Sequence, residues 1–360
     1  MQVTDFAPLT ALGLMSGTSM DGIDAAIVET DGERLIGFGP GASFPYDAEF
    51  RERLRGLIAH GGDEAEVARE LTERHAGAVG RLLEGIGGVD VIGFHGHTVS
   101  HRPDRGLSRQ IGDGAALARL TGIPVVDDFR SRDLMEGGEG APLAPLFHAA
   151  LARDMEKPVA VLNIGGVANL TWIGPEGELL AFDTGPGNAL IDDWTLKTTG
   201  RPMDEDGRLA RGGEADARAL AALLEHPYFL KPPPKSLDRN AFGAGALGGA
   251  SAADGAATLT RFTAAAVARA RDFLPSPPRR WLVTGGGRLN GSLMAAIAQA
   301  LEADVEPVEA VGWRGDVLEA QAFAFLAVRS LRGLPLSLPG TTGVSRPVSG
   351  GVLHRPPGDD

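Results

Sequence analysis

Residues 13–24 read Gly-Leu-Met-Ser-Gly-Thr-Ser-Met-Asp-Gly-Ile-Asp, and this stretch separates two apolar runs at 10–12 and 25–28. Apolar runs on either side of a small, polar stretch predict a strand, a turn and a second strand. Glycines in such a turn let backbone N–H groups approach an anion, and the hydroxyl side chains add donors. The stretch therefore predicts an anion-binding loop, although a plain polar hairpin turn would have the same composition.

Two carboxylates, Asp21 and Asp24, belong to the same stretch. Acidic side chains beside an anion site make sense when the anion arrives with a divalent cation, because Mg²⁺ is held by one or two carboxylates together with substrate phosphates. We interpret the stretch as a clamp for a metal–nucleotide phosphate, with Asp21 as the candidate Mg²⁺ ligand.

Composition excludes several other classes of protein. The chain has 360 residues, a net charge of −13 and no cluster of Lys and Arg, which argues against nucleic acid as a partner. It has no cysteine, so disulfides, thiolate metal sites and a cysteine nucleophile are excluded, and a reducing cytoplasm is the expected compartment. The first residues do not resemble a secretory signal, and no apolar run is long enough to cross a membrane.

The order of predicted elements in the first half of the chain recurs in the second half. Each half begins with strand, glycine turn, strand, turn and strand, and continues into helices, which suggests two related α/β domains facing each other across a cleft. The predicted strands are 10–15, 24–30, 34–38, 89–94, 124–127, 159–164, 168–172, 179–182 and 280–283. The predicted helices are 48–59, 63–87, 113–121, 143–153, 189–199, 215–226, 257–273, 292–301 and 316–331.

Glycine-rich turns follow three of these strands, at 16–22, 165–166 and 285–287. One such turn could be a simple chain reversal, but three at corresponding strand ends fit a nucleotide, with the first two at the phosphates and 284–290 at the nucleoside. The Walker A and Rossmann glycine motifs are both absent. A nucleotide enzyme built on this sequence would therefore be of the actin-like, sugar-kinase kind.

Asp183 is the candidate catalytic carboxylate, because it follows a predicted strand beside the glycine loop of the second half. A carboxylate there could take a proton from a hydroxyl or a water during attack, or it could simply cap the next helix.

Three further side chains have both a functional and a structural interpretation. His97, which forms an HxH pair with His95, could bind a sugar or be a loop histidine with its hydrogen bonds satisfied. The pair could also bind a metal ion, but the sequence offers no obvious third ligand. Arg130 could bind a substrate carboxylate or pair with a neighbouring aspartate. Glu319 could reach a substrate hydroxyl or favour the start of the last helix.

At these residues the chain resembles the anhydro-N-acetylmuramic acid kinase family, within the actin-like and sugar-kinase superfamily. The similarity runs in order through nearly the whole chain and is most specific in the first segment and in FDTGPGN. The matching segments are GLMSGTSMDGIDAAIVE (13–29), GFHGHT (93–98), QIGDGAALA (110–118), VVDDFRSRD (125–133), GGEGAPLAPLFH (137–148), LNIGGVANLT (162–171), AFDTGPGNALIDDW (181–194), TGGG (284–287) and LEAQAFAFLA (318–327).

The resemblance implies an α/β fold of two ribonuclease-H-like domains flanking a central cleft, with ATP and Mg²⁺ as cofactors and a homodimer as the assembly. We expect the first domain to span residues 1–135, joined by the tail from about 340 to 360, and the second to span 136–339. The family hydrolytically opens 1,6-anhydro-N-acetylmuramic acid and transfers the γ-phosphoryl of ATP to the released 6-oxygen, in cell-wall recycling.

By resemblance, Asp183 matches the general base for the attacking water. The residues expected to bind ATP are Gly17, Thr18, Ser19, Met20, Asp21, Gly22, Ile23, Asp24, Gly165, Gly166, Gly285, Gly286, Gly287 and Asn290. Those expected to bind the sugar are Ser16, His97, Arg130, Gly185, Asn188 and Glu319.

The chain departs from the family pattern within 232–240, which reads PPPKSLDRN in place of the usual PPPKSTGRE, and at Ser337, where asparagine is usual. The resemblance therefore assigns no role to residues 236–240 or to Ser337. Two rival functions remain. One is a kinase for another anhydro-sugar such as levoglucosan, but that sugar has no carboxylate for Arg130 to bind. The other is a nucleotide-dependent clamp that catalyses no reaction, and such a protein would not need Asp183 as a base.

Overall fold

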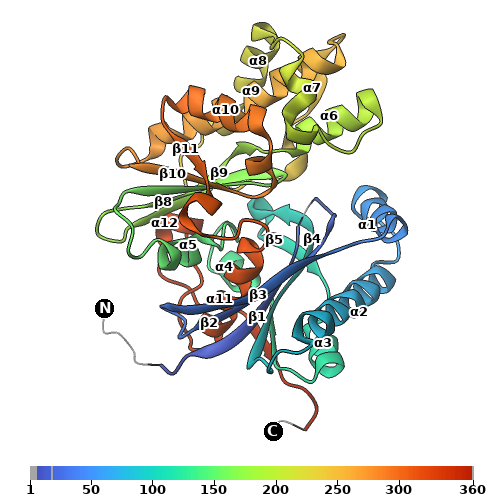
Figure 1. Cartoon of the computed structure of the whole chain (residues 1–360), viewed down its shortest axis with the longest axis vertical. Coiled ribbons are helices and arrows are strands. Elements are labelled where there is room, and N and C mark those ends of the chain that lie inside the picture. Colours follow the sequence, from blue (N-terminus) through green and yellow to red (C-terminus); the bar gives the residue numbers. More distant parts are fainter. Residues whose placement is uncertain (1–5, 18, 359–360) are drawn as a thin grey trace. The chain divides into compact units, whose positions relative to one another are not determined.

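The computed structural model of the chain describes residues 6–17 and 19–358 and contains two compact units (Figure 1). The first unit comprises residues 1–153 and 316–360, and the second comprises 154–315. These boundaries differ from the predicted 135/136 and 339/340. Helix α11 (Leu318–Leu331) packs on the first sheet and α5 (Pro145–Leu151) contacts α11, although both lie in the sequence range predicted for the second domain. Within the described residues, no helix is both long enough and apolar enough to span a membrane.

The sheet of the first unit begins with the antiparallel strands β1 (Leu9–Ser16), β2 (Gly22–Thr30) and β3 (Leu35–Pro45). Strand β4 (Val91–Arg102) pairs in parallel with β1, and β6 (Val125–Asp127) pairs in parallel with β4. Two short strands complete the sheet antiparallel to their neighbours: β5 (Leu107–Ile111) on β4, and β12 (Val352–His354) on β6. The C-terminal tail thus joins the first unit.

Alternation along the strands directs side chains to two different layers of helices. Leu12 and Leu14 of β1 share a buried cluster with α1 (Ala48–His60), α2 (Glu64–Leu83) and α3 (Gly114–Thr121). Gly13 lies between them and faces the opposite side, where α11 (Leu318–Leu331) packs against β1, β2 and β4. This two-residue period is what a strand buried on both faces requires.

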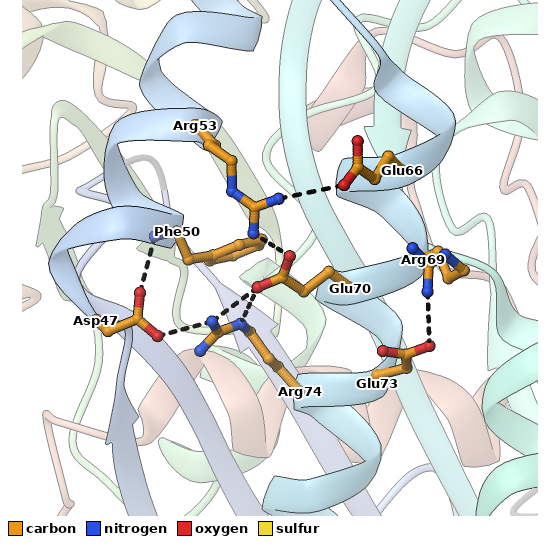
Figure 2. A network of polar contacts seen from close by, with 8 residues as sticks. All are labelled: Asp47, Phe50, Arg53, Glu66, Arg69, Glu70, Glu73 and Arg74. Atoms are coloured by element: carbon orange, nitrogen blue, oxygen red, sulfur yellow. Dashed lines mark hydrogen bonds and ion pairs between the residues drawn. The ribbon is translucent and has the colours of Figure 1, made fainter.

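An ionic network joins α1 to α2, and Figure 2 shows its members. The carboxylate of Glu70 accepts hydrogen bonds from the guanidinium groups of both Arg53 and Arg74. Arg74 also donates to Asp47 Oδ2 at 2.7 Å, and Asp47 caps α1 by accepting from the N–H of Phe50 at 2.8 Å. The guanidinium of Arg74 lies 4.5 Å from the centre of the Phe50 ring. The network therefore fixes the start of α1 against α2.

Glu70→Gln is expected to lower the free energy of unfolding by about 1 kcal/mol, because it leaves two half-buried guanidinium groups without their shared anion. The loss should shrink in high salt, which screens the remaining charges. Urea unfolding at low and high salt measures both effects. Glu73→Gln is the matched control, since Glu73 pairs only with the exposed Arg69 in this network, at 3.4 Å. Equal effects of the two substitutions would contradict the prediction.

The second unit repeats the order of the first. Strands β7 (Val159–Ile164), β8 (Val167–Ile173) and β9 (Leu179–Pro186) are antiparallel, and β10 (Arg280–Thr284) and β11 (Val305–Pro307) continue in parallel from β7. One face is covered by α9 (Ala252–Ala270) and α10 (Gly291–Leu301), whose buried side chains share a core with the sheet. The strand orders β3-β2-β1-β4-β6 and β9-β8-β7-β10-β11 correspond position by position.

The remaining helices are shorter and lie mostly in the connections. They are α4 (Ser131–Met135), α5 (Pro145–Leu151), α6 (Ala189–Thr199), α7 (Arg208–Arg211), α8 (Ala217–Leu224) and α12 (Pro339–Thr342), with 3₁₀ turns at Pro103–Arg105, Glu205–Gly207, Pro227–Leu230, Arg239–Ala241, Ala244–Leu247, Arg271–Phe273, Gly286–Leu289 and Val308–Val311.

Two predicted strand ends were wrong in a way that affects the site. Strand β4 was expected to end at residue 94, but it continues to Arg102, so His95 and His97 are strand residues. Strand β9 was expected to end at 182, but it continues to Pro186, so Asp183 lies inside the strand. In both cases pairing with a neighbouring strand, β5 for β4 and β8 for β9, extends a polar segment that local sequence predicts as loop.

Candidate active site

The stretch from Ser16 to Asp24 forms the predicted strand, turn and strand, and Thr18 lies outside the described residues. The turn is closed by a hydrogen bond from the N–H of Met20 to the carbonyl of Gly17 at 3.0 Å. Gly22 is needed for packing, since a Cβ there would lie 2.4 Å from the carbonyl oxygen of Phe44. Gly17 is different: an added Cβ would have Ser19 Oγ, at 3.5 Å, as its nearest neighbour among the described residues. The fold therefore leaves room beside the backbone of Gly17.

The carboxylates of this stretch lie in an acidic environment within the first unit. Asp21 is exposed and accepts from Ser19 Oγ at 2.8 Å, and Asp24 accepts from Ser43 Oγ at 2.5 Å. Burial, opposed by the Ser43 hydrogen bond and assisted by the charges of the nearby acids, raises the pKa of Asp24 to about 7; those acids are Asp21, Glu319 and Asp316. The structure thus brings Glu319 into electrostatic range of the loop, as a shared site would require.

A magnesium ion fits this donor set only with help from another ligand. The donors are hard carboxylate and hydroxyl oxygens, which Mg²⁺ prefers. The described residues contain no group of three or more acidic or histidine side chains close enough to hold a metal ion by themselves. One or two carboxylates completed by phosphate oxygens is the usual arrangement for Mg²⁺, and Asp21 and Asp24 could supply them.

The pKa of Asp24 gives a prediction for the ligand-free protein. Because the folded pKa of about 7 lies above the unfolded value of 3.8, the folded state binds more protons across this interval. The free energy of unfolding contributed by Asp24 should therefore fall as the pH rises from about 4 to about 7. Asp24→Asn should lack this slope, and urea unfolding in EDTA across that range measures it. Parallel pH curves for the two proteins would refute the assignment.

Ser16 and His97 are adjacent across β1 and β4 and are both buried. Ser16 Oγ lies 3.0 Å from His97 Nδ1 and accepts from the hydroxyl of Tyr46 at 2.8 Å. Burial lowers the pKa of His97 to about 4, so the ring is neutral near pH 7. Its Nε2 is buried without a hydrogen-bond partner in the described part of the chain. A ring nitrogen in that state can still form one hydrogen bond. Sequence reasoning missed Tyr46, which lies outside every matching segment.

His95 is a satisfied histidine rather than half of a metal pair. Its Nδ1 lies 3.0 Å from the carbonyl of Gly96, and its Nε2 lies 2.9 Å from Arg130 Nη2. Burial, followed by the Arg130 charge, lowers the pKa of His95 well below its usual range. Arg130 also donates to the carbonyl of Gly140 at 2.6 Å. Both of these groups, the His95 ring and the Gly140 carbonyl, are electrically neutral, and they fix the position of the Arg130 guanidinium.

Asp183 is buried within β9, with 6% of its surface exposed, and its peptide N–H donates to the carbonyl of Lys235 at 2.9 Å. The peptide N–H of Leu237 donates to Asp183 Oδ2 at 2.7 Å. This hydrogen bond orients the carboxylate, and it comes from the segment where the chain departs from the family pattern. The backbone makes the contact, so the altered side chains at 236–240 do not remove it.

The second and third glycine turns lie at the same end of adjacent parallel strands, β7 and β10, as the sequence predicts. The N–H groups of Gly187 and Asn188 donate to the carbonyls of Gly166 and Gly165 at 2.9 and 2.8 Å. The Asn188 amide donates to the carbonyl of Ile164 at 3.2 Å, so Asn188 occupies the N-cap position of α6 without a capping hydrogen bond from its side chain. These contacts gather residues 165–166, 187–188 and 285–287 at one strand end.

Several glycines and Asn290 of this region have structural roles. Gly285 has a left-handed φ of 76°, and a Cβ on Gly287 would lie 2.4 Å from Ile164 Cγ2. A Cβ on Gly185 would lie 2.9 Å from that of Ala266. Asn290 caps α10 by accepting from the N–H of Leu293 at 3.0 Å. By contrast, an added Cβ at Gly165 or Gly286 would meet nothing closer than 3.6 or 3.8 Å.

The repeated strand order and the glycine turns define an α/β protein with two ribonuclease-H-like sheets. The sequence profile of the family described as anhydro-N-acetylmuramic acid kinase matches residues 9–356, so the chain belongs to that family.

Relatives that bear this name are similar over almost their whole length. The one from Rhodospirillum rubrum is 58% identical over 95% of this chain and 93% of its own, and the one from Paramagnetospirillum magneticum is 57% identical over 97% and 100%. Among solved structures, component A of the (R)-2-hydroxyglutaryl-CoA dehydratase of Acidaminococcus fermentans aligns with a TM-score of 0.46 at 11% identity, covering 89% of this chain and 99% of its own.

Proposed function

We propose that the protein is an ATP-dependent kinase that opens 1,6-anhydro-N-acetylmuramic acid with water and phosphorylates its 6-oxygen. The products are N-acetylmuramic acid 6-phosphate and ADP. The observation that carries this proposal is the match to one family over residues 9–356, with relatives of that name at 57–58% identity. The reaction places the protein in cell-wall recycling.

Asp183 acts as the general base in this proposal. Its carboxylate takes a proton from water while the water oxygen bonds to the anomeric carbon and the bond from that carbon to the 6-oxygen breaks. The released 6-oxygen then bonds to the γ-phosphorus while the bond from that phosphorus to the β–γ bridging oxygen breaks, so ADP leaves. The proton taken from water stays on Asp183 until it is released to solvent. Burial of Asp183 and the Leu237 hydrogen bond to Oδ2 support the role, because they hold the carboxylate in one orientation.

Gly17 and Gly165 are proposed to contact the phosphates of ATP. The room beside their backbones supports this, because the fold itself does not require glycine there whereas an approaching phosphate would. Bound Mg²⁺ would neutralise phosphate charge during the transfer, and the acids at 21 and 24 are the candidates to hold it.

His97, Arg130 and Glu319 are proposed to bind the sugar, where the buried Nε2 of His97 offers a hydrogen-bonding position. We also propose a homodimer, because the family resemblance implies one, and a cytoplasmic location, with which a sequence without cysteine is consistent.

An ATP-coupled assay against a panel of sugars tests the function. We expect turnover with 1,6-anhydro-N-acetylmuramic acid and none with its open form or with levoglucosan, which lacks the carboxylate. In ¹⁸O-labelled water the product should carry one solvent oxygen at the anomeric carbon. No turnover of the muramic sugar would refute the function, and turnover without ¹⁸O at that carbon would refute water attack.

A further inference from the structure

Lys235 carries a buried ammonium group that the proposed reaction does not use. The residue is 2% exposed, and Nζ lies 4.6 and 4.7 Å from the ring centres of Tyr228 and Phe273 and 5.8 Å from that of Phe182. Nζ also donates to the carbonyl of Tyr228 at 3.2 Å. Burial lowers the pKa of Lys235 to about 8, so the group is still mostly protonated at neutral pH. A lysine buried as a cation costs stability, and the aromatic faces and the carbonyl offset part of that cost.

The segment fastened by this ammonium is the one that holds Asp183. The carbonyl of Lys235 accepts from the N–H of Asp183, and the N–H of Leu237 donates to its Oδ2. Tyr228, which accepts from the Lys235 ammonium through its carbonyl, also contacts Asp183 directly: its hydroxyl donates to the carbonyl of Asp183 at 2.6 Å. The side chain of Lys235 links its own segment to Tyr228, so the backbone and one carboxylate oxygen of Asp183 depend on both.

We propose that Lys235 is a positioning residue, whose ammonium group ties residues 235–237 to Tyr228 and so keeps the Leu237 N–H on the Asp183 carboxylate. The structural part of this inference needs only the contacts above, and its effect on turnover rests on the proposed function of Asp183. It also explains how residues 236–240 can diverge, because the side chain that holds the segment is Lys235 and the group that touches Asp183 is a main-chain N–H.

Lys235→Met tests the inference, because methionine fills the aromatic surroundings without a charge. We expect kcat to fall by about 10- to 100-fold, since small misplacements of reacting groups have effects of this size, while the KM for ATP stays unchanged. Amide hydrogen exchange at Leu237 and Asp183 should quicken by about tenfold in the ligand-free protein. Lys197→Met is the matched control, since Lys197 is exposed in the last turn of α6 in the same unit, and it should alter neither quantity.

Chemical rescue gives a second measurement that does not depend on how well the methionine variant folds. The chain has no cysteine, so Lys235→Cys offers one thiol, which can be alkylated in the unfolded state with 2-bromoethylamine and the protein then refolded. The resulting side chain restores an ammonium at nearly the length of lysine. Alkylation with iodoacetamide gives a neutral control of similar size. We expect the aminoethylated protein to regain both kcat and protection of the Leu237 and Asp183 amides from hydrogen exchange. The carbamidomethylated protein should regain neither.

The outcomes separate this inference from the proposed function. Unchanged exchange at Leu237 in Lys235→Met, or equal protection in the two alkylated proteins, would overturn the positioning role whatever the activity. Failure of the wild-type protein to turn over the muramic sugar would refute the proposed function instead, and would leave the exchange results as the test of the contacts.

Discussion

Asp183→Asn is expected to lower kcat by about 10²- to 10⁴-fold or more while leaving ATP affinity unchanged, because removing a general base has an effect of this size. Asparagine is the substitution that separates loss of the base from loss of structure most clearly. Its amide oxygen can still accept from the N–H of Leu237, so the side chain keeps its orientation while losing the ability to take a proton. The loss would then report chemistry rather than disorder of the segment.

Turnover with the anhydro-sugar and calorimetric titration with ATP measure the two halves of this prediction. Asp193→Asn is the matched control in the same unit. Asp193 forms an exposed ion pair with Arg239 at 3.1 Å, a kind of contact that contributes little to stability. Turnover of Asp183→Asn close to that of the control would remove Asp183 from the mechanism.

Gly13→Ala is expected to lower the free energy of unfolding by about 3 kcal/mol or more, because overpacking a core against backbone costs at least as much as overpacking against side chains. A Cβ on Gly13 would lie 1.8 Å from the carbonyl oxygen of Ala320 and 2.5 Å from the amide nitrogen of Ala324. Gly93 on β4 meets the same helix, with a Cβ position 2.1 Å from the carbonyl oxygen of Phe323. Relief requires α11 to move away from the sheet.

Gly77→Ala is the matched control for the same substitution in a different setting. Gly77 lies inside α2, and an added Cβ would meet nothing within 4 Å among the described residues. It should stabilise the protein by about 0.5–1 kcal/mol, since alanine favours a helix interior over glycine. Urea unfolding measures both variants. A Gly13→Ala protein as stable as the wild type would show that α11 does not pack this closely on β1.

The sequence predicted the elements whose local pattern and tertiary environment agree. The apolar strand at 159–164 and the helix at 189–199 have the predicted bounds, and the order of strands and turns at the start of each half is confirmed. The strands β5, β11 and β12 were missed. They are short and lie at the margins of their sheets, where partners from distant parts of the chain matter more than local propensity.

The site shows the same division between local and distant determinants. The stretch from Ser16 to Asp24 was recognisable because its glycines, hydroxyls and acids are consecutive. The partners Tyr46, Tyr228 and Lys235 were not predicted, because they lie 30 or more residues from the groups they contact and belong to no motif that marks a ligand. Asp183 was predicted by type but placed beyond its strand.

By itself the sequence determined the repeated α/β order, the glycine turn between two strands, and the carboxylates available for chemistry, because these depend on residue types that are adjacent in the chain. Only the tertiary structure decided which groups meet those residues: the neutral, buried His97 beside Ser16, the raised pKa of Asp24, and the main-chain N–H that orients Asp183. Burial and hydrogen bonding are set by segments that folding brings together from far apart, and no local pattern encodes that proximity.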